Sequence, residues 1–261
     1  MTISAQLTIL LFPGAFGSPD GFEKLLPHLN GFETFPVSYP SSNPSEPGTA
    51  SCPNDIAVVR DNVFAPLIEQ QHKDVVILAH SYGGVVGGAA AKGFDKVSRQ
   101  ARGQSGGIVG LIYVAGNITL ENESLLEAVG GTYPPFIKLN QPSPGFAFLD
   151  PAMEILYNDC DPSRSDELNK YTLPHSSLAF ESKPSAPAWA DKGFDGRRAY
   201  IRTLDDACNP SFLQDIWLEK SKVKWDVVDF KTGHMPFVSQ PEALAEQIKK
   251  FVEAFTGSGT Q

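Results

Sequence analysis

Hydrophobic residues occur along most of the chain in short runs that alternate with helical patterns. Apolar, β-rich runs, the second of them broken by prolines, predict strands at 7–12, 32–40, 74–79, 108–116, 197–204 and 224–230. Residues with helical periodicity predict helices at 20–29, 55–71, 82–99, 210–221 and 240–255. Asn54 or Asp55 is the expected N-cap of the helix at 55–71. This alternation predicts an α/β fold with a mostly parallel twisted sheet flanked by helices.

The alternation stops between residues 117 and 193. This stretch has many prolines and aromatic residues and no clear strand pattern. It is too long to be a plain connection within a compact domain. We therefore expect a small, largely helical cap over one end of the sheet at 117–193, and a core built from 1–116 and 194–261.

Composition narrows the class of protein. A chain of 261 residues can bury one large core and a small appendage. The net charge of -9, without a basic cluster, argues against nucleic acid or an anionic membrane as a partner. Three widely spaced cysteines form neither a disulfide framework nor a CxxC metal motif. Because no signal peptide or membrane span is apparent near the N-terminus, we expect a cytoplasmic protein. The sequence leaves its oligomeric state open, and a homodimer is one option.

The stretch DVVILAHSYGGVV (74–86) carries the first chemical signal. A buried strand ends at Ser81, and the chain turns at once into a glycine-rich helix. Ala79 and Gly83 stand two residues before and two residues after Ser81. A tight strand–serine–helix turn requires small residues at these positions, because the strand and helix backbones pass close together. The Tyr82 amide would then point toward a forming oxyanion. The plainer alternative is a serine that caps a helix, and helix packing alone would explain the glycines.

A serine nucleophile needs a base and an acid that orients the base, here in the order serine, acid, histidine. His234 is the one histidine late enough in the chain, in a loop that follows a strand. Asp205 and Asp206 end the preceding strand, and Asp206 is favoured because Pro210 follows it four residues later. Its role would be to hold the tautomer of the imidazole and to stabilise the imidazolium.

A second glycine-rich turn, FPGAFGSPDGF (12–22), follows the first buried strand. Gly14 lets the backbone approach a ligand closely. The amide of Ala15 is the expected second donor of an oxyanion hole, with Phe16 as the alternative. A plain strand-to-helix turn explains the glycines but not their coincidence with the serine turn.

The segments PGAFGSPDGFEKL, VVILAHSYGG, YIRTLDDACNP and TGHMPFVSQPEAL together resemble the α/β-hydrolase fold, in the compact branch that contains plant methyl esterases and hydroxynitrile lyases. The resemblance implies an eight-stranded sheet, whose first strands are missing or short here, and no metal or cofactor. The chain departs from the family with Pro13 in place of a histidine. Gly14 and Met235 stand where the lyases have threonine and lysine, which favours hydrolysis over cyanide release.

These observations predict a serine hydrolase that acts on an ester or lactone of a hydrophobic small molecule through an acyl-enzyme. Aromatic and other side chains of the cap and the turns are expected to line the substrate pocket. The expected substrate-binding residues are Phe16, Tyr133, Phe136, Tyr157, His175, Trp189 and Met235. Two alternatives stay open: a lyase or cyclase on the same fold, and a small-molecule receptor without catalysis.

Overall fold

The computed structural model describes residues 7–257, and its centre is a parallel sheet of six strands in the order β2-β1-β3-β4-β8-β9. The predicted α/β architecture is confirmed, with six strands in this sheet within residues 7–257 where the family resemblance implied eight. β1, β3 and β4 lie within the sheet and are almost wholly apolar and buried, as strands covered on both faces must be. The strands are β1 (Thr8–Phe12), β2 (Glu33–Pro36), β3 (Asp74–His80), β4 (Gly107–Val114), β8 (Arg198–Thr203) and β9 (Asp226–Phe230).

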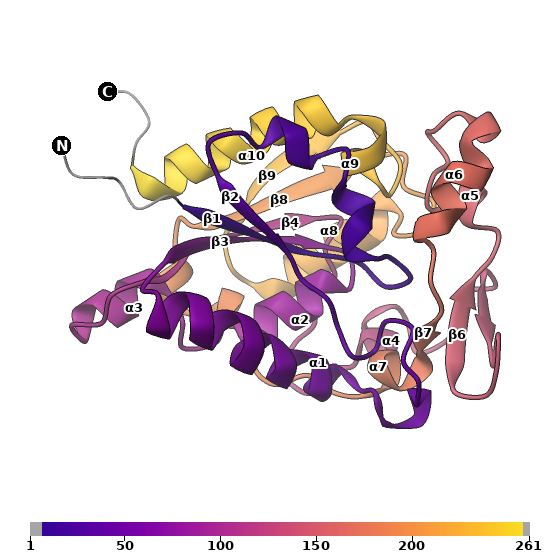
Figure 1. The fold of residues 1–261 in the computed structure, drawn as a ribbon, viewed down its shortest axis with the longest axis horizontal. Helices are drawn as coiled ribbons and strands as arrows, with labels where there is room; N and C mark the ends of the chain where they lie inside the picture. The colour runs from indigo at the N-terminus through magenta and orange to yellow at the C-terminus, as the bar shows by residue number, and fades with distance from the viewer. Residues whose placement is uncertain (1–6, 258–261) are drawn as a thin grey trace.

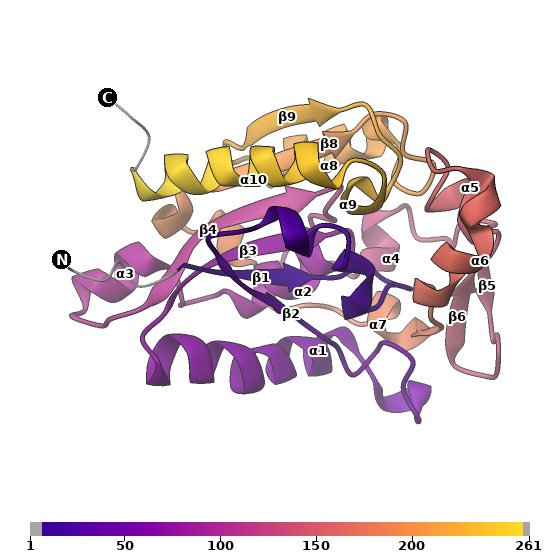
Figure 2. The same cartoon turned by 45° about the horizontal axis from the view of Figure 1, so that its top comes forward.

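Helices cover both faces of the sheet (Figure 1). The long helix α10 (Pro241–Thr256) lies on one face, where its Leu244, Ile248 and Phe255 are buried. Figure 2 shows α1 (Cys52–Val59) and α2 (Gly83–Ala90) on the opposite face. No helix in the range 7–257 is long and apolar enough to cross a membrane. The remaining helices of the core are α3 (Lys96–Ala101), α8 (Ser211–Ser221) and α9 (Pro236–Ser239).

Three predicted helices differ in detail from those observed. Residues 20–29 form two separate 3-10 turns, Pro19–Phe22 and Leu26–His28, each with a proline in its first turn. The helix expected at 55–71 begins earlier, because the Ser51 side chain accepts the amide of Asn54 and makes Ser51 the N-cap; it then continues as a π-helix over Arg60–Gln70. The helix expected at 82–99 is split into α2 and α3.

Most of the segment 117–193 lies at one end of the sheet, on the right of Figures 1 and 2, and its last residues run back to pack against α2 and α3. It contains short helices, as expected, and also an antiparallel sheet in the order β5-β6-β7 that the sequence did not indicate. These strands have two to four residues, too few for a period of two to be recognised. The elements are α4 (Leu125–Ala128), β5 (Ile137–Leu139), β6 (Phe146–Leu149), α5 (Ala152–Ile155), α6 (Ser165–Leu168), β7 (His175–Ser176) and α7 (Ser177–Glu181).

Backbone hydrogen bonds join the second half of this segment to the core. The amide of Leu173 donates to the carbonyl oxygen of Phe16 (2.7 Å), and the amide of Ser176 donates to that of Ser41 (2.9 Å). In return, the amide of Asn43 donates to the carbonyl oxygen of Pro174 (2.9 Å). The chain around β7 is therefore fixed against the loops that follow β1 and β2.

Arg198, at the start of β8, is only 3% exposed although it is charged. Its guanidinium donates to the carbonyl oxygens of Trp189 (2.5 Å) and Asp191 (2.7 Å) and to the carboxylate of Asp195 (3.0 Å). Replacing Arg198 with methionine keeps most of the packing but leaves these buried carbonyl groups without a donor. We expect the free energy of unfolding to fall by about 3 kcal/mol, measured by urea titration.

The matched control is Arg197→Met, because Arg197 is more exposed and donates one hydrogen bond, to the carbonyl oxygen of Phe255. This change is expected to lower the free energy of unfolding by about 1 kcal/mol. Equal losses in the two variants would show that the buried contacts of Arg198 do not carry the difference.

Candidate active site

Ser81 lies at a strained turn between β3 and α2. Its φ of +49° is in the left-handed region, which a serine adopts only where its surroundings impose it. A Cβ atom at Gly83 would lie 2.5 Å from the carbonyl oxygen of Phe12, and one at Gly14 would lie 2.9 Å from Cβ of Ser81. The two glycines are therefore required by the close approach of the chain segments, which the sequence pattern predicted for Gly83, whereas Gly14 was expected to admit a ligand.

Asp206 and His234 are brought together across the ends of β8 and β9. Nδ1 of His234 donates to Oδ2 of Asp206 over 2.8 Å, and the hydroxyl of Thr203 donates to the same oxygen. The amides of Cys208 and Asn209 donate to Oδ1 of Asp206. Four donors thus hold this carboxylate in one orientation.

The carboxylate of the adjacent Asp205 accepts no hydrogen bond within residues 7–257. Its carbonyl oxygen accepts a hydrogen bond from the Asn158 side chain, and its amide donates to the carbonyl oxygen of Thr232. Of the two acids that the sequence offered, the structure joins Asp206 to the imidazole.

The protonation of the buried histidines follows from their neighbours. Burial opposes the charge on the His234 imidazole, but the carboxylate of Asp206, aided by Cys208, outweighs it and holds the pKa of His234 well above its usual value. Burial and the neighbouring His234 lower the pKa of His80 well below its usual value. Neutral His80 donates through Nε2 to the backbone carbonyl oxygen of His234 (2.9 Å) and so fixes the loop that carries His234.

The turn after β1 lies beside Ser81. Phe16 in this turn has a φ of +62°, and its neighbour Ala15 lines the same cavity as Ser81. Within residues 7–257, the amides of Ala15 and Tyr82 donate to no protein acceptor. Both amides therefore lack a hydrogen-bond partner in the described part of the chain.

Behind this turn, the Tyr82 side chain belongs to a buried polar cluster of Ser41, Asp55, Tyr82 and His175. Asp55 accepts hydrogen bonds from the hydroxyls of Tyr82 (2.7 Å) and Ser41 (2.5 Å), so Nε2 of His175 must donate to Ser41 (2.8 Å). Although the cluster holds a serine, an acid and a histidine, the acid contacts the serine instead of the imidazole. Ser41 is also fully buried, so a substrate cannot reach it. The contacts instead fix the tyrosine ring that follows Ser81.

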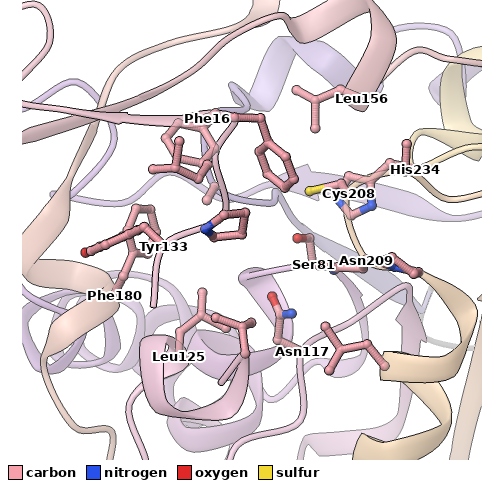
Figure 3. A pocket seen from close by; sticks show the side chains of 18 of the residues that line it. Phe16, Ser81, Asn117, Leu125, Tyr133, Leu156, Phe180, Cys208, Asn209 and His234 are labelled. Atoms are coloured by element: carbon pink, nitrogen blue, oxygen red, sulfur yellow. The ribbon is translucent and has the colours of Figure 1, made fainter. Parts of the chain in front are cut away.

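A cavity of about 260 Å³ opens beside Ser81 and His234 (Figure 3). Its wall is mostly apolar and comes from the turn after β1, the segment 117–193 and the loop after β8. Of the residues predicted to bind substrate, Phe16, Tyr133 and Phe136 line it. The lining residues are Ala15, Phe16, Ser81, Asn117, Leu125, Leu126, Val129, Tyr133, Pro134, Phe136, Ile137, Leu156, Phe180, Ala207, Cys208, Asn209, Pro210, Leu213 and His234.

The other four predicted substrate-binding residues do not line this cavity. Tyr157 and Met235 face a small separate hollow behind the turn at Pro13. His175 is fully buried in the polar cluster, where burial lowers its pKa to about 3. Trp189 packs against α2 beside Gly88 and against Trp225. Each of these side chains fills the interior of the protein instead of facing a substrate.

Sequence analysis missed three polar lining residues: Asn117, Cys208 and Asn209. Asn117 comes three residues after β4, at the same edge of the sheet as Ser81. Cys208 and Asn209 come two and three residues after Asp206. Their common signal was position: in a parallel α/β sheet, residues just beyond the carboxyl ends of the strands form the ligand crevice.

Comparison with known proteins gives a consistent picture. The sequence matches the alpha/beta hydrolase family over residues 9–247. It is 24% identical to an alpha/beta hydrolase of Aspergillus novofumigatus, over 92% of this chain and 94% of that protein. It is 23% identical to a pyrethroid hydrolase of Sphingobium wenxiniae, over 94% of this chain and 88% of that protein.

Among solved structures, the fold is similar to that of a methylesterase from Arabidopsis. The TM-score is 0.67 and the sequence identity is 19%, with 95% of this chain and 99% of that chain covered. The resemblance to plant methyl esterases that the sequence motifs indicated is therefore confirmed at the level of the fold.

Proposed function

Since the chain belongs to the alpha/beta hydrolase family, we propose that it is a serine hydrolase that cleaves a carboxylic ester or lactone of a hydrophobic small molecule. One arrangement supports this most directly: Ser81 on its strained turn lines the same apolar cavity as His234, whose imidazole is hydrogen-bonded to Asp206. The pyrethroid hydrolase and the methylesterase among the similar proteins bear names that fit ester chemistry.

In this proposal, His234 removes the proton from Ser81 as the serine attacks the ester carbonyl. The amides of Ala15 and Tyr82 stabilise the oxyanion, and such a donor contributes about 3 kcal/mol to lowering the barrier. His234 then gives its proton to the leaving alcohol and activates the water that hydrolyses the acyl-enzyme. Asp206 holds Nδ1 of His234 and stabilises the imidazolium formed in each step.

The cavity supports a neutral, largely apolar substrate. Its lining contains no lysine, arginine, aspartate or glutamate, so apart from the His234 imidazole no side chain in the wall would pair with a charged substituent. At Met235, the residue after His234, there is no lysine to stabilise a departing anion such as cyanide. These features favour hydrolysis of an ester over the lyase alternative.

The direct test is labelling of the protein with a fluorophosphonate probe, followed by assay of a panel of aryl esters and lactones with identification of the products. We expect covalent labelling of Ser81, located by peptide mass spectrometry, and release of an acid and an alcohol. Folded protein that neither takes up the probe nor turns over any ester would instead support a receptor without catalysis.

The raised pKa of His234 predicts the pH dependence of the reaction. The base accepts a proton only when neutral, so kcat/KM should rise with pH and level off above that pKa. Because the pKa is raised, the inflection should lie above about 6.5, the value of an unperturbed histidine. The position of this inflection is measured from initial rates between about pH 5 and pH 10, on an ester without titratable groups. An inflection below the unperturbed value would contradict the proposed role of Asp206 beside the imidazole.

A further inference from the structure

The polar residues of the cavity differ in whether they already have partners in the protein. The Asn209 side chain donates to the carbonyl oxygen of Ala115 (3.1 Å), and the Tyr133 hydroxyl donates to the Glu181 carboxylate (2.9 Å). The Asn117 carboxamide makes no hydrogen bond among residues 7–257. Asn117 therefore offers two donors and a carbonyl acceptor to whatever occupies the cavity.

Asn117 is held in a fixed position next to the nucleophile. Its backbone amide donates to the carbonyl oxygen of Ser81 over 3.0 Å. Its own carbonyl group packs so closely on α2 that a Cβ atom at Gly84 would lie 2.7 Å from it. Only 2% of the residue is exposed, and its carboxamide points into the cavity (Figure 3). The carboxamide is not among the buried polar atoms that lack a partner, so its polar atoms are accessible in the cavity, where a ligand would replace water as their hydrogen-bond partner.

In the view of Figure 3, Ser81 lies between the Asn117 carboxamide and the His234 imidazole. The leaving alcohol must lie on the imidazole side, because His234 gives it a proton. The Asn117 carboxamide then faces the acyl side of the ester. The surrounding wall, which includes Leu125 and Leu126, is apolar, so a polar substituent on the acyl group would find its partner at Asn117.

We propose that Asn117 determines specificity by hydrogen bonding to a hydroxyl or carbonyl group on the acyl part of the substrate, next to the scissile carbonyl. This rests on the proposed ester hydrolysis and narrows its substrate class. The preferred substrates are hydrophobic esters of 2-hydroxy or 2-oxo acids. A site that hydrogen-bonds a substrate group discriminates against the analogue without it, because the protein amide is then left unpaired.

The test compares methyl 2-hydroxy-3-phenylpropanoate with methyl 3-phenylpropanoate. Each kcat/KM is divided by the rate of hydroxide-catalysed hydrolysis of the same ester, which removes the intrinsic effect of the hydroxyl. The wild-type protein should prefer the hydroxy ester roughly tenfold to a hundredfold. In Asn117→Leu, which keeps the shape without the polar atoms, this ratio should fall close to one. Tyr133→Phe is the matched control, since it removes a lining hydroxyl that already has a partner, and it should keep the wild-type ratio.

The outcomes separate this inference from the proposed function. Turnover of both esters with equal corrected kcat/KM in the wild-type protein overturns the role of Asn117 and leaves the hydrolase intact, even if Asn117→Leu does not fold. A preference for a hydroxyl in the alcohol part of the ester would also overturn it. If neither ester is turned over, their affinities for Ser81→Ala are compared by calorimetry, where equal Kd values exclude the hydrogen bond to Asn117.

Discussion

Replacement of Ser81 with alanine should lower kcat for ester hydrolysis by about a millionfold and abolish fluorophosphonate labelling. The change removes the attacking oxygen while it keeps the Cβ atom at the turn, so the fold and the melting temperature should be retained. The reaction is followed by release of a chromophoric alcohol, with the protein checked by circular dichroism. The residual rate would come from binding and from the oxyanion donors alone.

The control for this experiment is Ser41→Ala. Ser41 also contacts a histidine and an acid, but in the buried cluster away from the cavity. The Ser41→Ala protein should still be labelled by the fluorophosphonate at Ser81. Loss of labelling in Ser41→Ala together with full labelling of Ser81→Ala would move the nucleophile to the buried cluster and refute the proposed site. The double variant Ser81→Ala/His234→Ala should have a kcat only slightly lower than that of either single variant, because the two residues act as a unit.

Replacement of Asp206 with asparagine should lower kcat by about ten-thousandfold. The amide can occupy the same space, but it carries no charge to stabilise the imidazolium, and it can present a donor to Nδ1 of His234. The imidazole would then be held in the wrong tautomer to accept the proton of Ser81. Because the carboxylate raises the pKa of His234, the inflection of the pH–rate profile should also move to lower pH.

The matched control is the neighbouring Asp205→Asn. Among residues 7–257, Asp205 forms hydrogen bonds only through its backbone, so kcat and the pH profile should stay at wild-type values. If Asp205→Asn caused the larger loss, the acid would be assigned to the wrong aspartate. Stopped assays at several pH values on both variants distinguish these results.

The sequence was sufficient for the sheet and for the positions of Ser81, Asp206 and His234. These residues follow strands whose patterns are strong, and the order of the parallel fold brings their ends to one edge. The turns were clear as well, because glycine at 14 and 83 is required by close backbone contacts that any version of this turn must make. Such features depend on local backbone geometry, which a short stretch of sequence specifies.

The pocket wall was much harder to predict, because it depends on packing between distant segments. Leu156 faces the cavity while its neighbour Tyr157 faces the opposite way, and no pattern in this irregular stretch distinguishes them. The sequence predicted His175 to face a ligand, but its hydrogen-bond partner Ser41 lies 134 residues earlier. Contacts of this range are not visible in sequence periodicity.

The hydrogen bonds that join Leu173, Pro174 and Ser176 to the loops after β1 and β2 have a consequence for how a substrate enters. A hinged opening of the whole segment 117–193 would break these bonds and separate His175 from Ser41. Entry by local displacement of the part that contains α4 leaves them intact. The part around α4 is also tied to the core, since Nε1 of Trp217 donates to the carbonyl oxygen of Ala128 (3.0 Å) and Lys220 pairs with Glu123, so admission of a molecule by either route breaks contacts with the core.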